Sequence, residues 1–224
     1  MTNVLYFHGF ASSPASAKIT ALRPLLEPDG VVLDTPDLNV PSFERLDFDR
    51  IVDSAVDRAR ENPPRVLVGS SLGALVALAV AKRGVHVPLV LIAPALGVAK
   101  RWKSRIPDGD PVMVFNHARA ADAPIHRAFF EQMATLDVDD DPPPTPVTAI
   151  MGRNDETVPF WVVEETWQRW EASGRLPQGS RLVVVEEGDH GLVDQAELIR
   201  EAIVQGARRS ARADAHKSAP GARA

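Results

Sequence analysis

One serine in the sequence has the neighbours that a catalytic nucleophile needs. Gly69-Ser-Ser-Leu-Gly73 reads as Gly-x-Ser-x-Gly, directly after the apolar run Val66–Val68 and directly before a stretch with helical periodicity. A sharp turn from strand to helix would hold the central Ser71 with its hydroxyl projecting, while the two glycines let neighbouring backbone approach. The pattern therefore predicts a nucleophilic Ser71, although a serine before a helix is often only an N-cap.

Two further polar residues stand just after apolar runs, where they could complete a catalytic set with Ser71. Asp155 follows the run Val147–Met151, and His190 follows the run Leu182–Val185. Parallel strands present their carboxyl ends at one edge of a sheet, and sites are built along that edge. The three residues are therefore expected to lie together.

In such a set, His190 would act as the base and Asp155 would orient it. A neutral histidine takes the serine proton during attack, and the aspartate accepts the other ring N–H. Each residue also has an ordinary interpretation, as a surface histidine and as a turn-forming aspartate. Glu156 is the alternative acid, whereas Asp189 is a poor one because adjacent side chains diverge.

The apolar run Val4–Phe7 ends in His8-Gly9-Phe10, which predicts an oxyanion hole. We assign its two donors to the backbone N–H groups of Phe10 and Leu72. The side chain of His8 is expected mainly to hold this loop by hydrogen bonds.

Apolar runs alternate with helical stretches, which predicts an α/β fold with a mostly parallel sheet of about six strands and helices on both faces. Helices are expected over about 14–26, with Pro14 as the first helical residue, and over about 49–60 and 72–83. The predicted strands are Val4–Phe7, Val31–Leu33, Val66–Val68, Leu89–Ile92, Val147–Met151 and Leu182–Val185.

Residues of about 94–146 break this rhythm and are too many for a simple connection, so they predict a cap inserted after a strand. A helix over about 122–136 is expected within it. Aromatic residues of the cap could line an apolar acyl pocket, or could only pack the cap onto the domain. The candidate pocket residues are His8, Phe10, Trp102, Phe129 and Phe130.

Composition and length set the broader limits. The chain of 224 residues predicts one domain over 1–205, followed by a disordered tail over 206–224 that is rich in Ala, Arg, Ser and Gly. A net charge of −5 and the absence of cysteine argue against a nucleic-acid surface, disulfides and thiolate metal sites. No apolar run reaches the roughly 20 residues of a membrane span, and no leader pattern precedes the first strand, so a cytoplasmic protein is expected.

The segments His8-Gly-Phe-Ala-Ser-Ser-Pro-Ala-Ser-Ala-Lys18 and Val68-Gly-Ser-Ser-Leu-Gly73 together resemble the YqiA-type group of small bacterial α/β-hydrolase esterases. The resemblance is specific over roughly the first third of the chain. It implies an α/β-hydrolase fold shortened by its first two strands, with esterase or thioesterase chemistry. It also carries over Ser71, Asp155 and His190 as the catalytic triad.

These observations predict a serine hydrolase of a small-molecule acyl ester or thioester that needs no metal or organic cofactor. An acyltransferase or a carbon–carbon bond hydrolase on the same fold is an alternative, as is a ligand-binding receptor with little turnover. Arg101, Arg105 and Arg153 could attract an anionic substrate, although exposed arginines are usually only solvated. The aspartates of 137–141 are expected to form a solvated loop.

Overall fold

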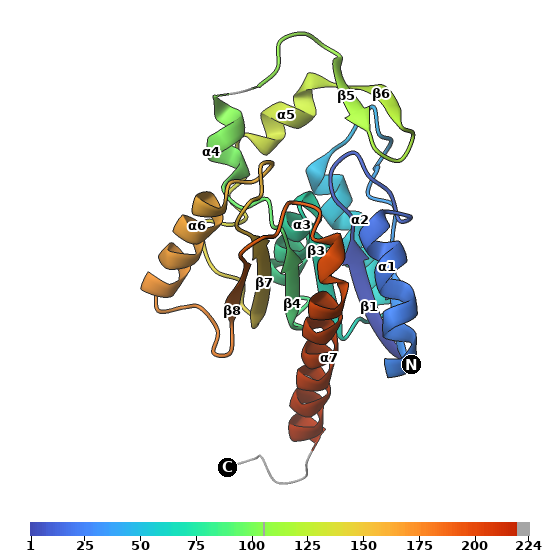
Figure 1. Cartoon of the computed structure of the whole chain (residues 1–224), viewed down its shortest axis with the longest axis vertical. Coiled ribbons are helices and arrows are strands. Elements are labelled where there is room, and N and C mark those ends of the chain that lie inside the picture. The colour runs from blue at the N-terminus through green and yellow to red at the C-terminus, as the bar shows by residue number, and fades with distance from the viewer. Residues whose placement is uncertain (105, 219–224) are drawn as a thin grey trace.

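An entirely parallel sheet of six strands, in the order β2-β1-β3-β4-β7-β8, forms the centre of the computed structural model (Figure 1), which describes residues 1–104 and 106–218. All six predicted strands are confirmed. They are β1 (Thr2–Phe7), β2 (Val31–Asp34), β3 (Val66–Ser70), β4 (Leu89–Ile92), β7 (Val147–Gly152) and β8 (Arg181–Val185).

The four inner strands β1, β3, β4 and β7 are buried on both faces over most or all of their length, which is why they read as mainly apolar runs. The chain leaves β1 for β2 on one side and returns to β3 on the other, so the strand order reverses between β1 and β3. Open α/β sheets place their ligands at the carboxyl ends of the strands beside such a reversal.

Helices cover both faces of the sheet. Helix α1 (Ala17–Leu26) packs against α7 (Ala196–Ser218) on one face, and α2 (Phe48–Glu61) packs against α3 (Leu72–Lys82) on the other (Figure 1). A 3₁₀ turn (Glu27–Asp29) follows α1, α6 (Phe160–Ala172) joins β7 to β8, and a second 3₁₀ turn (Val193–Gln195) precedes α7. No helix within residues 1–104 and 106–218 has the length and apolarity that a bilayer span requires.

The expected helix over 72–83 is confirmed to within one residue. The helix expected over 49–60 is also confirmed and is one residue longer at each end. The first helix, however, begins later than predicted. Its first residue is Ala17 rather than Pro14, and Ser16 occupies the N-cap. Residues 12–16 instead form a loop along the carboxyl edge of the sheet, where Ser12 and Ser16 border a cavity described below.

The segment between β4 and β7 lies above the carboxyl ends of the strands (Figure 1) and occupies the span predicted for the cap. It contains α4 (Val98–Lys103), an antiparallel hairpin of β5 (Val112–Asn116) and β6 (Ala121–Ile125), and α5 (Arg127–Met133). The helix predicted over 122–136 is therefore wrong for its first turn, because residues 122–125 pair with β5. Pairing between strands depends on a partner segment, so it could not be predicted from the periodicity of residues 122–125.

The tail predicted to be disordered over 206–224 is wrong for residues 206–218, which continue α7; residues 219–224 lie outside the described part. The sequence offered no large apolar face there, but small residues do the packing. Ala207 and Ser210 are buried, and Gly206 lies against Val66 of the sheet. Alanine and arginine are also strong helix formers, so the composition suits a helix that approaches the sheet closely.

Candidate active site

Ser71 occupies a sharp turn between β3 and α3. Its backbone has φ 54° and ψ −117°, a region that non-glycine residues rarely adopt. Its N–H donates to the carbonyl of Ile92 (2.9 Å) and its own carbonyl accepts from Ala95 (3.2 Å), and these bonds hold the turn. Although Ser71 stands at the N-cap of α3, its side chain makes no capping hydrogen bond. The hydroxyl of Ser71 is therefore not used to cap the helix.

The two glycines of the motif are required by close backbone contacts. A Cβ at Gly69 would collide with the backbone of Gly73 and Ala74, and a Cβ at Gly73 would collide with the carbonyls of Phe7 and His8. The turn can therefore form only where both positions lack a side chain.

Asp155 and His190 are in direct contact. The Nδ1 atom of His190 lies 2.7 Å from Oδ2 of Asp155, whose side chain is fully buried, whereas that of His190 is 25 % exposed. The other carboxylate oxygen, Oδ1, accepts from the backbone N–H groups of Thr157 (2.9 Å) and Val158 (2.7 Å). Asp155 is thus fixed by its own loop and presents one oxygen to the imidazole.

Neither of the other acids near the site takes this position. Glu156 is exposed and makes no hydrogen bond among the described residues. Asp189 is also exposed, and its Oδ1 accepts from the backbone N–H of Leu192 (2.9 Å). Asp155 is therefore the acid that the geometry favours.

The acid loop (residues 152–159) and the base loop (residues 186–192) meet through glycines. A Cβ at Gly152 would collide with the backbone of Gly188 and Asp189. The N–H of Asn154 donates to the carbonyl of Gly188 (2.9 Å), which closes the contact. The packing of the two loops brings the carboxylate of Asp155 to the ring of His190.

A cavity of about 440 Å³ lies at the carboxyl edge of the sheet, and Ser71 and His190 both border it. Gly9, Phe10, Lys18 and His117 are among the other residues around it. No hydrogen bond joins Ser71 to His190 in the described structure. Catalytic hydrogen bonds are often long without substrate and shorten in the reacting complex.

The two predicted oxyanion donors lie at this edge. Phe10 borders the cavity, and Leu72 is the first residue of α3. A Cβ at Gly9 would lie 3.4 Å from Cβ of Ser71, so the loop after β1 runs close beside the serine. Within the described residues, neither the N–H of Phe10 nor that of Leu72 has a hydrogen-bond acceptor in the protein. Neither group is therefore committed to an acceptor elsewhere in the fold.

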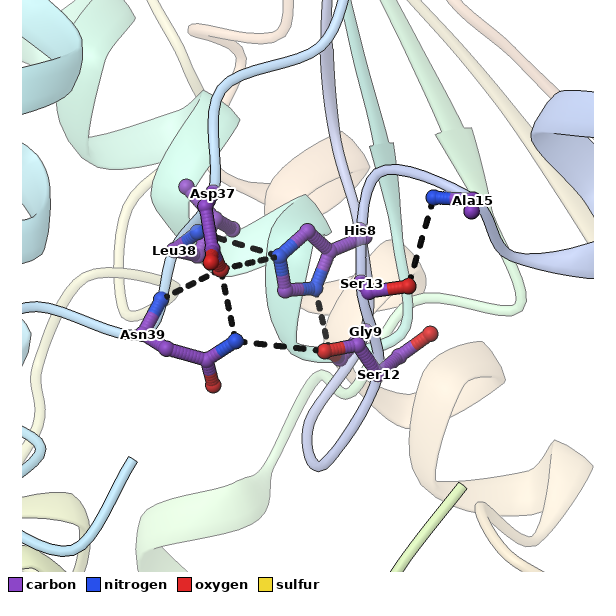
Figure 2. A network of polar contacts seen from close by, with 8 residues as sticks. All are labelled: His8, Gly9, Ser12, Ser13, Ala15, Asp37, Leu38 and Asn39. Atoms are coloured by element: carbon purple, nitrogen blue, oxygen red, sulfur yellow. Dashed lines mark hydrogen bonds and ion pairs between the residues drawn. The ribbon is translucent and has the colours of Figure 1, made fainter. Parts of the chain in front are cut away.

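His8 holds the loop after β1, as expected, but it is not a pocket residue. It is buried to 2 % exposure, and Figure 2 shows its ring turned toward the segment of residues 37–39. Nδ1 donates to the carbonyl of Gly9 (2.9 Å) and Nε2 accepts from the N–H of Leu38 (3.0 Å). This pattern requires the neutral ring protonated on Nδ1. The prediction that His8 lines the cavity is wrong because both ring nitrogens are used elsewhere.

Burial lowers the pKa of His8, against the opposing effects of the Gly9 carbonyl and the Asp37 carboxylate. Since the folded pKa lies below the unfolded value of about 6.5, the unfolded chain binds more protons in acid. The stability contributed by neutral His8 is therefore complete above about pH 6.5 and is lost as the pH falls through the lower, folded pKa.

We expect His8→Asn to lower the free energy of unfolding by about 1–3 kcal/mol at pH 8, because a buried donor loses its acceptor. The difference from wild type should shrink at pH 5, because the unfolded wild-type chain binds a proton at His8 below about pH 6.5 and the folded chain binds it less readily. Urea unfolding at both pH values measures this difference in the free energy of unfolding. His86→Asn, at an exposed position, is the control. An equal difference at both pH values would contradict the assigned ring state.

The aromatic residues predicted to line the pocket pack against one another instead. The ring of Phe10 stacks on Phe129 with centroids 5.7 Å apart, and Trp102 and Phe130 lie 5.2 Å apart beside them. Phe129 and Phe130 are buried, and only Phe10 of this set borders the cavity. The expectation is therefore wrong for Trp102, Phe129 and Phe130, because their rings dock the cap onto the loop that carries Phe10.

The arginines considered as anion binders are engaged elsewhere or lie outside the described residues. Arg153 pairs with Glu186 and stacks on Phe160 at 4.6 Å, and Arg101 donates to the carbonyl of Thr157 (2.6 Å). Arg105 is not among the described residues.

Sequence reasoning missed Lys18 and His117, which do border the cavity. Lys18 is the last residue of the segment 8–18 that carries the family resemblance, and that position could have marked it as a site residue. His117 stands in the cap with no pattern that marks it. Within the described residues, no group of three or more histidines, cysteines or acids is placed to hold a metal ion.

Comparison with known proteins agrees with this architecture. The model of an uncharacterised protein family, UPF0227, matches residues 3–204. No curated protein sequence matches the chain.

Among solved structures, Est1E of Butyrivibrio proteoclasticus with bound ferulic acid is similar, with a TM-score of 0.75 and 18 % identity over 95 % of this chain and 90 % of that one. The esterase domain of a Rhodothermus marinus protein has a TM-score of 0.70 and 19 % identity over 93 % and 87 % of the two chains. The mouse α/β-hydrolase domain-containing protein 10 has a TM-score of 0.70 and 19 % identity over 91 % and 88 %. The predicted α/β-hydrolase fold is confirmed.

Proposed function

Because the chain belongs to UPF0227, an uncharacterised family, and has the α/β-hydrolase fold, we propose that it is a serine hydrolase of carboxylic esters or thioesters. One observation carries the proposal. A buried Asp155 holds the Nδ1 side of His190 at 2.7 Å, and Ser71, at a strained turn, borders the same cavity. A fold supports many functions, so the proposal rests on these groups and not on the fold.

In the acylation half of the proposed reaction, Oγ of Ser71 attacks the carbonyl carbon while Nε2 of His190 takes the hydroxyl proton. The N–H groups of Phe10 and Leu72 donate to the oxygen that becomes negative. When the tetrahedral intermediate collapses, the bond to the alcohol or thiol breaks and His190 returns the proton to that leaving group.

In the deacylation half, water takes the place of the leaving group. His190 removes a proton from the water as its oxygen attacks the acyl carbon, and then protonates Oγ of Ser71 as the acyl–oxygen bond breaks. Asp155 accepts the Nδ1–H throughout and stabilises the imidazolium while it exists. Both halves require neutral His190, so the rate should fall in acid.

A fluorophosphonate probe tests the proposed nucleophile without knowledge of the substrate. We expect one probe per native chain, with the label mapped to Ser71 by peptide mass spectrometry, since activated serines react and ordinary ones do not. Heat-denatured protein is the control and should stay unlabelled. Esters of p-nitrophenol from C2 to C12 and matched thioesters then define the substrate class. Absence of both labelling and turnover would contradict the proposal and favour a binding protein.

A further inference from the structure

A lysine from the first helix reaches the backbone of the base loop. The Nζ atom of Lys18 donates to the carbonyl of Gly191 (2.7 Å) and to the carbonyl of His190 (3.1 Å). Helix α1 and the base loop are far apart in sequence, so this contact exists only in the folded chain. Lys18 also borders the cavity that contains Ser71.

The setting of this ammonium is unusual for a lysine. The side chain is partly buried, and within the described residues its Nζ has only neutral carbonyl acceptors and no ion-pair partner within salt-bridge distance. Desolvation lowers the pKa of Lys18, and the more distant charges of Asp155 and Asp189 oppose this effect. The fold thus holds a charged ammonium, which is costly to desolvate, against the peptide carbonyls of His190 and Gly191.

The base loop has few other constraints. Gly188 and Gly191 flank Asp189 and His190, and Leu192 adopts a left-handed backbone with φ 47°. Within the described residues, the other hydrogen bonds of residues 188–192 are those of the Gly188 backbone, the His190–Asp155 contact, the Leu192–Asp189 bond, and the Leu192 carbonyl accepting from Gln195. A glycine-flanked histidine needs such supports to keep its ring in one place.

We propose that Lys18 is a positioning residue for the base: its ammonium fixes the carbonyls of His190 and Gly191 and places a positive charge at the base loop. The inference rests on the proposed function, since it concerns how His190 is held. Lys18 does not touch the reacting atoms in this scheme.

The charge has a second consequence, because the imidazole becomes positive during catalysis. The titratable groups around His190 are Asp155 from the acid loop, Asp189 from its own loop, Lys18 from α1 and His117, which borders the same cavity. The carboxylates favour the imidazolium and Lys18 disfavours it. Removal of the Lys18 charge is therefore expected to favour the imidazolium.

Lys18→Met and Lys18→Arg separate a charged, hydrogen-bonding role from simple packing. For Lys18→Met we expect kcat to fall by about 10-fold or more and the acid limb of the kcat/KM profile to move up by about 0.5–1 pH unit. Lys18→Arg keeps the charge and two donors, so the acid limb should return to the wild-type position. Lys82→Met is the matched control, because desolvation also lowers the pKa of Lys82, at the far end of α3 from Ser71.

The titration of the His190 ring, followed by NMR and assigned with His190→Gln, gives the same test without turnover. An upward shift of its midpoint in Lys18→Met, reversed in Lys18→Arg and absent in Lys82→Met, supports the inference even if no ester is cleaved. An unchanged midpoint would overturn it, even if activity is lost. If Lys18→Met does not fold, Lys18→Gln replaces it in the same comparison.

Discussion

Substitution of Ser71 by alanine is expected to reduce ester hydrolysis by at least about 10⁴-fold. The reason is that the substitution removes only the Oγ atom that would form the acyl bond. Alanine meets the same backbone strain at φ 54°, and the wild-type side chain makes no capping bond to lose. Initial rates with p-nitrophenyl esters and a thermal unfolding midpoint near wild type would establish that chemistry, rather than folding, is lost.

The adjacent serine provides the matched control. Ser70 is the buried last residue of β3, so Ser70→Ala makes the same chemical change one position away. This variant should keep measurable turnover and fluorophosphonate labelling. Comparable losses in the two variants, or turnover by Ser71→Ala close to that of wild type, would show that the nucleophile is assigned wrongly.

The sheet and the turn that holds Ser71 could be predicted because each leaves a local trace in the sequence. Strands such as β3, buried on both faces, are mainly apolar, and their length distinguishes them from helices. Gly69 and Gly73 are needed because backbone occupies the space of their side chains. Asp155 could be placed after β7 for the same reason, although its contact with His190 is visible only in the structure.

The remaining features depend on contacts between distant segments. The β5–β6 hairpin is defined by pairing across two short strands, one of which contains Pro124. The end of α7 packs through Ala207 and Ser210, residues that composition alone counts as features of a disordered tail. Lys18 contacts a loop at the other end of the chain. Local periodicity carries no information on any of these contacts.

Two backbone donors determine what asparagine would do at position 155. Oδ1 of Asp155 accepts from the N–H groups of Thr157 and Val158, so the carbonyl oxygen of an asparagine must take that place. Its NH₂ group would then face Nδ1 of His190, where Oδ2 now lies at 2.7 Å. An NH₂ group donates, so it favours the tautomer of His190 that carries its proton on Nε2. That nitrogen can no longer accept the proton of Ser71.

We therefore expect Asp155→Asn to lower kcat by about 10³–10⁴-fold near neutral pH, with a much smaller change in KM. Steady-state kinetics with the best p-nitrophenyl ester measures both constants. Glu156→Gln, an equivalent carboxylate-to-amide change at the exposed neighbour, should leave kcat nearly unchanged. A large loss in Glu156→Gln with little effect of Asp155→Asn would transfer the orienting role to Glu156. Such a result would require the acid loop to rearrange when substrate binds, because in the present geometry the imidazole contacts Asp155 alone among the described acids.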